Sequence, residues 1–423
     1  MAEIRALAAV HLWGHFAGGV AESDDGVVTF EYDPEFARTG LEISPLKLPL
    51  AVRGPVTFPE LARIASFQGL PGVLADALPD RFGNAVIRAY FEQRGRPEAA
   101  LSPVQRLLYI GGRAMGALEF RPPTGVSRAA ERESLEVADL VAQARRIVEG
   151  STDVAVPEIM RVGASAGGLR PKAVILWNRA AGVVRSAFAP PRPGDEPWIV
   201  KFDGVGEPDA PDPMPRPFGR IEYAYAVMAR AAGLDVPETH LLRERRLAHF
   251  MVRRFDRTPD HGRLHLHTLG GMQHADYDAP GTFSYEQLLR TVLALGLGYP
   301  ALEEAFRRMV FNVAAVNQDD HVKNVAFLMT PEGRWSLAPA YDLTFARGHG
   351  FTRYHQMTIA GTREGITRAD LLAVGARFSI RKDGAEVIER VASALDRWPA
   401  AAREAGVPKK LVSEIGALHR RLV

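Results

Sequence analysis

The sequence predicts an α+β fold in three parts: a small N-terminal α/β domain, a strand-rich lobe and a mostly helical lobe. Up to Phe255 the chain is dominated by short apolar runs separated by turn residues, a pattern typical of strands. From Ser284 onward apolar residues recur at helical spacing, notably in residues 285–295, 301–316 and 385–395. We expect boundaries at residues 1–125, 126–283 and 284–423.

Three segments refine this outline. Residues 84–94 predict a helix among the short strands of the N-terminal domain. Residues 131–149 carry an apolar stripe at helical spacing, which predicts a helix leading into the first lobe. Between residues 185 and 220 proline and glycine recur, which predicts loops around one strand.

Composition limits the class of protein. The chain has 423 residues, of which 47% are hydrophobic and 24% charged, ordinary values for a globular protein with several cores. It contains no cysteine, which excludes a disulfide framework and a thiolate metal site, so the cytoplasm is the default expectation. No apolar run approaches the roughly 18 residues that a spanning helix needs, so we expect no membrane segment.

A net charge of +2 argues against binding to a polyanion through bulk charge. Arginine clusters occur at residues 243–246, 253–254 and 420–421. We interpret them as solvated faces of strands and helices in preference to direct phosphate contacts.

Residues 317–324 contain the most informative motif. Asp319 and Asn324 stand in the Asp-x-x-x-x-Asn spacing of a kinase catalytic loop, where the acid accepts a hydroxyl proton and the amide binds magnesium. Two short strands, 325–329 and 335–338, predict a hairpin that returns Asp342 beside Asn324 as a second metal ligand. The alternative is that Asp319 and Asp320 only cap or solvate a loop.

A second group of residues lies upstream. The glycine-rich stretch 161–172 runs into a predicted strand at 173–177, and glycines let backbone amides approach phosphate oxygens. Lys201 lies near the end of the next predicted strand, 198–202, and Glu222 lies near the start of a predicted helix at 221–232, so the two could pair. Taken separately, the glycine-rich stretch could be an ordinary hairpin, Lys201 an exposed lysine on an edge strand, and Glu222 an acid that complements the helix dipole. Because they occur in this order and are followed by Asp319 and Asn324, together they indicate phosphoryl transfer.

The motifs at residues 165–172, 199–201, 253–256, 319–324 and 340–343 together resemble the HipA family of serine/threonine kinase toxins. Residues 30–34, 44–50, 69–70, 78–80 and 112–118 are similar to the small domain that precedes the kinase core in that family. The resemblance covers nearly the whole chain. It implies a two-lobed protein-kinase-like fold with an N-terminal accessory domain.

The resemblance implies ATP and Mg²⁺ as cofactors and gives each matching residue a role. Asp319 matches the catalytic base, and Asn324 and Asp342 match the magnesium ligands. Ser165 matches a serine that family members phosphorylate on themselves, which would repel the nucleotide phosphates from the loop. The residues that match the nucleotide site are Ala166, Gly167, Gly168, Lys172, Lys201, Arg253, Arg254, Phe255, His321 and Lys323.

The resemblance also implies partners. They are a HipB-like helix-turn-helix antitoxin, DNA reached mainly through that antitoxin, and a protein substrate such as an aminoacyl-tRNA synthetase. Two alternatives stay open: a small-molecule kinase, and a catalytically weak nucleotide-binding subunit that supports an antitoxin repressor on DNA.

A rival site consists of His265, His267, His274 and Asp276. Alternation on a strand puts two imidazoles on one face, as in many metal sites, and zinc hydrolysis would be a different class of enzyme. No glutamate stands where a general base is expected, so we favour histidines that pack beside a cleft. We likewise interpret His321 as a residue that organises its loop.

Overall fold

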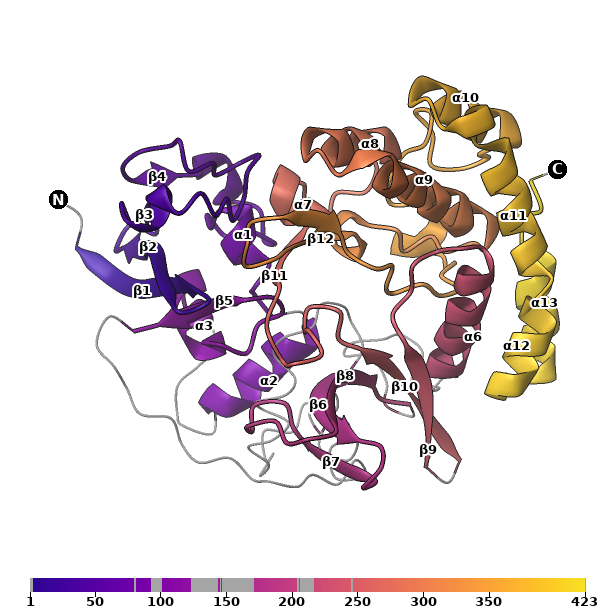
Figure 1. The fold of residues 1–423 in the computed structure, drawn as a ribbon, viewed down its shortest axis with the longest axis horizontal. Coiled ribbons are helices and arrows are strands. Elements are labelled where there is room, and N and C mark those ends of the chain that lie inside the picture. The colour runs from indigo at the N-terminus through magenta and orange to yellow at the C-terminus, as the bar shows by residue number, and fades with distance from the viewer. Residues whose placement is uncertain are drawn as a thin grey trace.

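The computed structural model describes residues 3–79, 81–92, 101–122, 144, 146, 171–203, 205, 217–244 and 246–422. Two predicted features lie outside these residues: most of the 131–149 helix, and the glycine-rich stretch with Ser165, Ala166, Gly167 and Gly168. In Figure 1 the N-terminal sheet lies on the left, a second sheet at the bottom and the helical lobe on the right.

The N-terminal domain is built on a five-stranded antiparallel sheet of order β4-β3-β2-β1-β5. Ala8, Val10 and Leu12 alternate with more exposed residues along β1, so one face of the sheet packs on the core. Helix α3 (Pro103–Ile110) covers that face and begins with a capping box between Ser102 and Gln105. The strands are β1 (Ile4–Leu12), β2 (His15–Ser23), β3 (Val28–Tyr32), β4 (Val56–Thr57) and β5 (Leu118–Arg121); short helices are η1 (Phe36–Arg38), η2 (Pro59–Leu61) and α1 (Gly72–Ala75).

The first lobe contains a second antiparallel sheet, of order β7-β6-β8-β10-β9. Its core includes Val174, Trp198 and Met251, and helix α2 (Arg81–Glu92) adds Val86 from the N-terminal section. Helix α6 (Phe218–Ala231) packs against β10. The strands are β6 (Lys172–Asn178), β7 (Val183–Ser186), β8 (Asp195–Lys201), β9 (Thr239–Glu244) and β10 (Leu247–Arg253).

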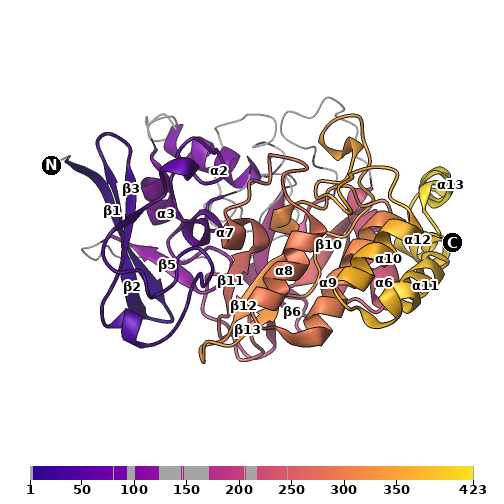
Figure 2. The same cartoon turned by 90° about the horizontal axis from the view of Figure 1, so that it is seen from above.

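The second lobe is helical, and Figure 2 shows its helices lying side by side. Capping boxes at Ser284 and Thr367 begin α8 (Tyr285–Ala294) and α10 (Arg368–Arg377). The remaining helices are α9 (Gly298–Ala314), α11 (Ala385–Leu395), α12 (Trp398–Ala405), α13 (Lys409–Leu418), η5 (Phe351–Arg353) and η6 (Arg381–Gly384). The helices predicted at 285–295 and 385–395 are therefore confirmed, and the one predicted at 301–316 begins three residues earlier, at Gly298.

A three-stranded sheet, β11-β12-β13, lies between the N-terminal domain and the helical lobe (Figure 1). Its strands are β11 (His265–Thr268), β12 (Ala326–Met329) and β13 (Trp335–Leu337), and α7 (Leu269–Gln273) and η4 (Val322–Asn324) flank them. Strands β12 and β13 form the hairpin that the sequence predicts, with Phe327 paired to Leu337. Among the described residues, no helix is both long enough and apolar enough to cross a bilayer.

The N-terminal domain meets the rest of the chain where α1 lies against α7. Two glycines allow this approach: a Cβ built on Gly72 would lie 2.1 Å from the carbonyl oxygen of Gly271. The amide of Gly72 donates a hydrogen bond to His274 Nε2 at 3.0 Å. The contact is therefore backbone against backbone and tolerates no side chain at residue 72.

We predict that Gly72→Ala lowers the free energy of unfolding by about 1–3 kcal/mol, because the added methyl group collides with the backbone of α7. Gly19→Ala is the matched control, since a Cβ there meets no atom within 4 Å. Denaturant unfolding of both variants measures the difference. Equal stability of the two variants would contradict the described approach of α1 to α7.

Candidate active site

Lys201 connects three separate parts of the chain. It is the last residue of β8, and its Nζ donates to Glu222 Oε1 at 2.5 Å and also to Asp342 Oδ1. Glu222 lies in the first turns of α6 and is buried, while Asp342 follows β13 in the helical lobe. The pairing of Lys201 with Glu222 that the sequence predicts is present in the structure.

The opposite charges of Lys201, Glu222 and Asp342 stabilise one another in their ionised forms. Burial would lower the pKa of Lys201, but the carboxylates of Asp342 and Glu222 outweigh it and raise that pKa. Burial would raise the pKa of Asp342, yet Lys201 and Lys172 hold it below its ordinary value. Lys201 and Asp342 are therefore both charged at neutral pH, as a phosphate-binding cation and a metal-binding carboxylate must be.

Lys172 lies beside Lys201. It is the first residue of β6, it is buried, and it is the cross-strand partner of Lys201 in the β6–β8 ladder. The amide of Phe202 donates to the carbonyl of Pro171 at 3.0 Å. The sheet therefore places the end of the predicted glycine-rich stretch next to Lys201, whereas Ser165 and the loop glycines lie outside the described residues.

The loop that follows α9 carries Asp319 and Asn324. The side chain of Asp319 is 38% exposed, the accessibility that a group meeting a substrate hydroxyl requires. Asn324 Nδ2 donates to the carbonyl of Asp319 at 2.7 Å. The hydroxyl of Tyr341 donates to the carbonyl of Lys323 at 2.6 Å, which ties this loop to the residue before Asp342.

The backbone of Asp342 has a positive φ of 54°, in the left-handed region that non-glycine residues rarely adopt. Such conformations cost free energy and cluster at functional sites. The side chain of Asp342 is 26% exposed, so it can meet a ligand.

The oxygen donors of Asp342 and Asn324 fit magnesium. This ion prefers hard oxygen ligands and is usually bound by one or two carboxylates together with phosphates and water. In the described part of the chain no three histidine, aspartate or glutamate side chains form a complete metal cage. Asp342 and Asn324 thus offer one carboxylate and one amide oxygen, donors of the type that magnesium prefers.

His321 and Lys323 shape the loop between these groups. The ring of His321 lies near Tyr277 and Phe351, and burial lowers the pKa of His321 to about 4. The ammonium of Lys323 lies 4.7 Å from the centre of the Tyr277 ring. His321 is therefore neutral at physiological pH, in line with a residue that organises its loop.

The three consecutive residues 253–255, predicted to belong to the nucleotide site, lie in three different environments. Arg253 points toward Glu238 on the surface, with 3.5 Å between Nη1 and Oε2. Phe255 stacks on Tyr341, with ring centres 5.4 Å apart. Arg254 is buried, its guanidinium donates two hydrogen bonds to Asp256, and its backbone amide donates to the carbonyl of Pro197 at 2.9 Å.

The rival zinc site is replaced by contacts with the N-terminal domain. His265 Nε2 lies 2.9 Å from the carbonyl of Ile43, and His274 Nε2 accepts from the amide of Gly72. Both ring nitrogens of His267 have partners in that domain, Asp76 at 2.7 Å and Ser44 at 3.0 Å. Asp276 accepts from Ser66 at 2.8 Å. The alternating histidines join two domains, and the described residues provide no metal site there.

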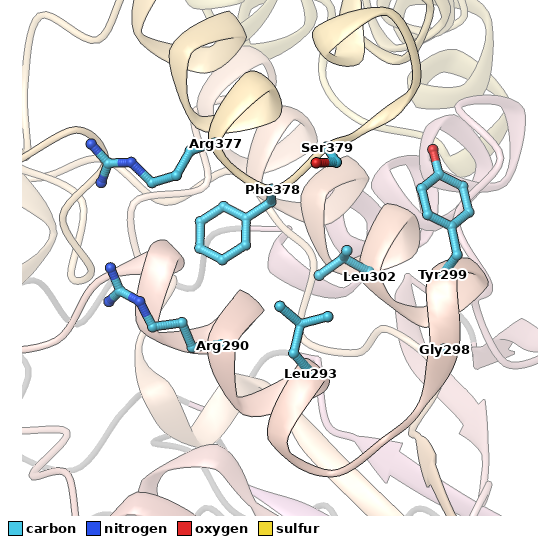
Figure 3. Close-up of a pocket in the computed structure, with 8 residues that line it drawn as sticks. All are labelled: Arg290, Leu293, Gly298, Tyr299, Leu302, Arg377, Phe378 and Ser379. Carbon is cyan, nitrogen blue, oxygen red and sulfur yellow. The ribbon is translucent and has the colours of Figure 1, made fainter.

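A cavity of about 580 Å³ opens elsewhere, between α8, α9 and the residues after α10. Figure 3 shows Leu293, Leu302 and Phe378 at its centre, with Arg290 and Arg377 to one side. None of the residues with predicted catalytic roles lines this cavity. We place the candidate active site at Lys201, Asp319 and Asp342, because these are the charged groups that phosphoryl transfer requires. The volume of a cavity is not sufficient to identify the site.

Comparison with known proteins gives two family matches. The model described as the HipA-like C-terminal domain matches residues 164–398, and the model described as the HipA N-terminal domain matches residues 8–121. Among solved structures, a chain of the Shewanella oneidensis MR-1 complex of HipA, HipB and its operator DNA is similar in fold. Its TM-score is 0.67 at 18% identity, and the match covers 97% of this chain and 94% of that chain.

Two curated relatives carry predicted kinase designations. Y4dM of Sinorhizobium fredii is 28% identical over 161 residues, which cover 34% of this chain and 36% of that protein. A Haemophilus influenzae protein is 29% identical over 159 residues, which cover 33% of this chain and 46% of that protein. The match thus spans less than half the length of each relative.

We predict that the interdomain histidines make stability depend on pH. Burial and the neighbouring His267 lower the pKa of His265 to about 4, below its ordinary value of 6.5. Between pH 6.5 and 4 the unfolded chain therefore binds more protons, and the free energy of unfolding falls as the pH falls. His265 should contribute on the order of 3 kcal/mol to this loss.

The measurement is denaturant unfolding at several pH values between 4 and 7 for the wild type, His265→Gln and His349→Gln. His265→Gln should flatten the dependence on pH, while the exposed control His349→Gln should follow the wild type. Parallel curves for all three proteins would contradict the burial of a neutral His265.

Proposed function

Because the chain belongs to the HipA family, we propose that it is a Mg-ATP-dependent serine/threonine protein kinase that acts as the toxin of a type II toxin-antitoxin pair. The observation that carries this proposal is the position of Lys201, whose ammonium bonds both Glu222 and Asp342. A kinase needs this lysine beside the nucleotide phosphates and this carboxylate beside the metal.

The proposed roles follow from the contacts. Lys201 neutralises charge on the nucleotide phosphates, and Glu222 holds its ammonium in place. Asn324 and Asp342 would hold the magnesium ion, which when bound neutralises charge that develops on the phosphate oxygens. Lys172 adds a positive charge on the neighbouring strand.

Asp319 is the proposed base. As the oxygen of a substrate serine or threonine forms its bond to the γ-phosphorus, the bond from that phosphorus to the β-phosphate oxygen breaks. The hydroxyl proton passes to the carboxylate of Asp319, and the products are ADP and the phosphorylated protein. The partial exposure of Asp319 supports this role, since the group must reach a hydroxyl on another molecule.

The proposal extends to partners and regulation. A HipB-like antitoxin would bind the protein and bring it to DNA, by analogy with the Shewanella oneidensis complex of HipA, HipB and operator DNA. The substrate would be a cytoplasmic component of translation, such as an aminoacyl-tRNA synthetase. Phosphorylation of Ser165, which lies within the glycine-rich stretch 161–172, would add negative charge that repels nucleotide phosphates and would switch the kinase off.

We predict that Asp319→Asn lowers phosphoryl transfer by about 10²–10⁴-fold, because the amide accepts no proton. The purified wild type and variant are incubated with Mg-ATP, and intact mass and phosphopeptide mapping record added phosphate. A single phosphate on Ser165 in the wild type, absent from the variant, is the expected result. Asp24→Asn, at an exposed position of the N-terminal domain, is the control and should behave as wild type.

The same variant separates the alternatives. Growth arrest in cells that express the protein should disappear with Asp319→Asn, whereas a nucleotide-binding subunit that only supports a repressor would retain its effect. Persistent toxicity in this variant would overturn the kinase-toxin proposal. Transfer to metabolites without transfer to protein would identify a small-molecule kinase.

We predict that Glu222→Gln lowers the transfer rate about 10–100-fold at saturating Mg-ATP, because Lys201 loses one of the two carboxylates that fix and charge it. Glu414→Gln is the control, since that glutamate is 51% exposed and lies beside Lys410 on α13. The rate of radiolabelled phosphate transfer is measured for both variants and for the wild type.

Chelation of magnesium should abolish transfer in the wild type and in both variants. Transfer that survives chelation would exclude Asn324 and Asp342 as metal ligands.

A further inference from the structure

We infer that Asp320, which follows Asp319 in the predicted catalytic loop, is a positioning residue. Its buried carboxylate holds this loop in place through hydrogen bonds on the side away from solvent. Asp320 is 2% exposed, so it cannot meet a substrate. Its neighbour Asp319 is 38% exposed in its side chain and faces outward. The two adjacent carboxylates are thus divided between a solvent-facing and a buried position, and the buried one has three donors around it.

The donors come from two elements distant in sequence. Oδ2 of Asp320 accepts from the hydroxyl of Tyr285 at 2.8 Å and lies 2.8 Å from Nδ1 of His355. Oδ1 accepts from the backbone amide of Gln356 at 2.7 Å. Tyr285 is the first residue of α8, and His355 and Gln356 lie between η5 and α10. A carboxylate only accepts, so Nδ1 of His355 carries the proton.

The residues that donate to Asp320 make further hydrogen bonds, which connect α9 and Gln318 to the same network. Asn312 Nδ2 of α9 donates to the Tyr285 hydroxyl at 2.9 Å, which fixes that hydroxyl toward Asp320. The side-chain amide of Gln356 donates to the carbonyl of Gln318 at 2.9 Å. The backbone on the N-terminal side of Asp319 is therefore bound to the same segment that binds Asp320.

The consequence for the reacting groups follows from the chain. Asp319 lies between Gln318 and Asp320, both of which are anchored, so its backbone has little freedom. Its carbonyl in turn accepts from Asn324, so the orientation of a proposed metal ligand depends on the same anchor. Displacement of about 1 Å in such a site costs on the order of 100-fold in rate, which makes the buried acid important without contact to the substrate.

The inference rests on the proposed kinase activity for its rate effect, but its structural part is tested separately. Asp320→Asn keeps the shape but replaces one acceptor oxygen with a donor, so either the Gln356 amide loses its acceptor or the hydroxyl of Tyr285 and the ring of His355 must reverse their donor roles. Tyr285→Phe removes one donor and leaves the carboxylate. Tyr32→Phe is the matched control: it deletes a buried tyrosine hydroxyl that donates to the carbonyl of Leu48, in the N-terminal domain.

Two readouts are used on the full-length variants. Hydrogen–deuterium exchange of peptides that cover residues 316–325 reports the order of the loop, and steady-state transfer from Mg-ATP reports the reaction. We expect at least tenfold faster exchange in Asp320→Asn and a smaller increase in Tyr285→Phe. We expect kcat to fall at least tenfold in Asp320→Asn while the KM for ATP changes less than threefold, because the nucleotide lysine is not touched. Tyr32→Phe should match the wild type in both.

The outcomes separate the two proposals. Unchanged exchange of residues 316–325 in Asp320→Asn overturns the positioning role, whatever the activity. Faster exchange in this loop with kcat within twofold of wild type also overturns it, since the anchor would then not matter for the reaction. If the wild type transfers no phosphate, the proposed function fails, and the exchange data alone decide whether Asp320 orders the loop.

Discussion

The ion cluster around Lys201 is the charged contact that joins the sheet of the first lobe to the loop that carries Asp342, and it acts alongside the apolar packing of α6 against α11 and α12. A lysine with only 12% of its side chain exposed is stable as a cation only if carboxylates compensate for lost hydration, and Glu222 and Asp342 do so. One carboxylate comes from α6 of the first lobe and the other from the helical lobe. The charge of a single side chain is therefore compensated from both lobes, which brings the strand that carries the lysine into contact with the loop that carries Asp342.

Buried carboxylates act in the same way at two other positions. Asp76 accepts from Thr268 and contacts His267, which joins the N-terminal domain to β11. Asp256 accepts from Arg254 and from the amide of Gly116, which joins that domain to the end of β10. Each carboxylate has several donors from segments far apart in sequence, so burial is compensated and the segments are held together.

The candidate site shows that volume and chemistry need not coincide. The 580 Å³ cavity beside α8 is lined mainly by apolar side chains and two arginines, whereas Lys201 and Asp342, whose pKa values are perturbed, lie at the junction of the sheet and the catalytic loop. Asp342 in particular combines a left-handed backbone with a pKa held low by Lys201 and Lys172. Strain and paired charge identify a functional position more directly than an open surface does.

The sequence by itself determined the elements and the chemical groups. Apolar periodicity located the helices at 285–295 and 385–395 and the β12–β13 hairpin, because these patterns depend on neighbours a few residues away. Lys201, Glu222, Asp319, Asn324 and Asp342 are predicted from the sequence because phosphoryl transfer needs those residue types in that order. Only the tertiary structure decided that the alternating histidines of β11 are a domain joint, that Arg254 faces Asp256, and that Asp320 is an anchor. The physical reason is that a buried polar side chain takes its role from its hydrogen-bond partners, and Ile43, Asp76, Tyr285 and His355 are brought to these residues by the fold alone.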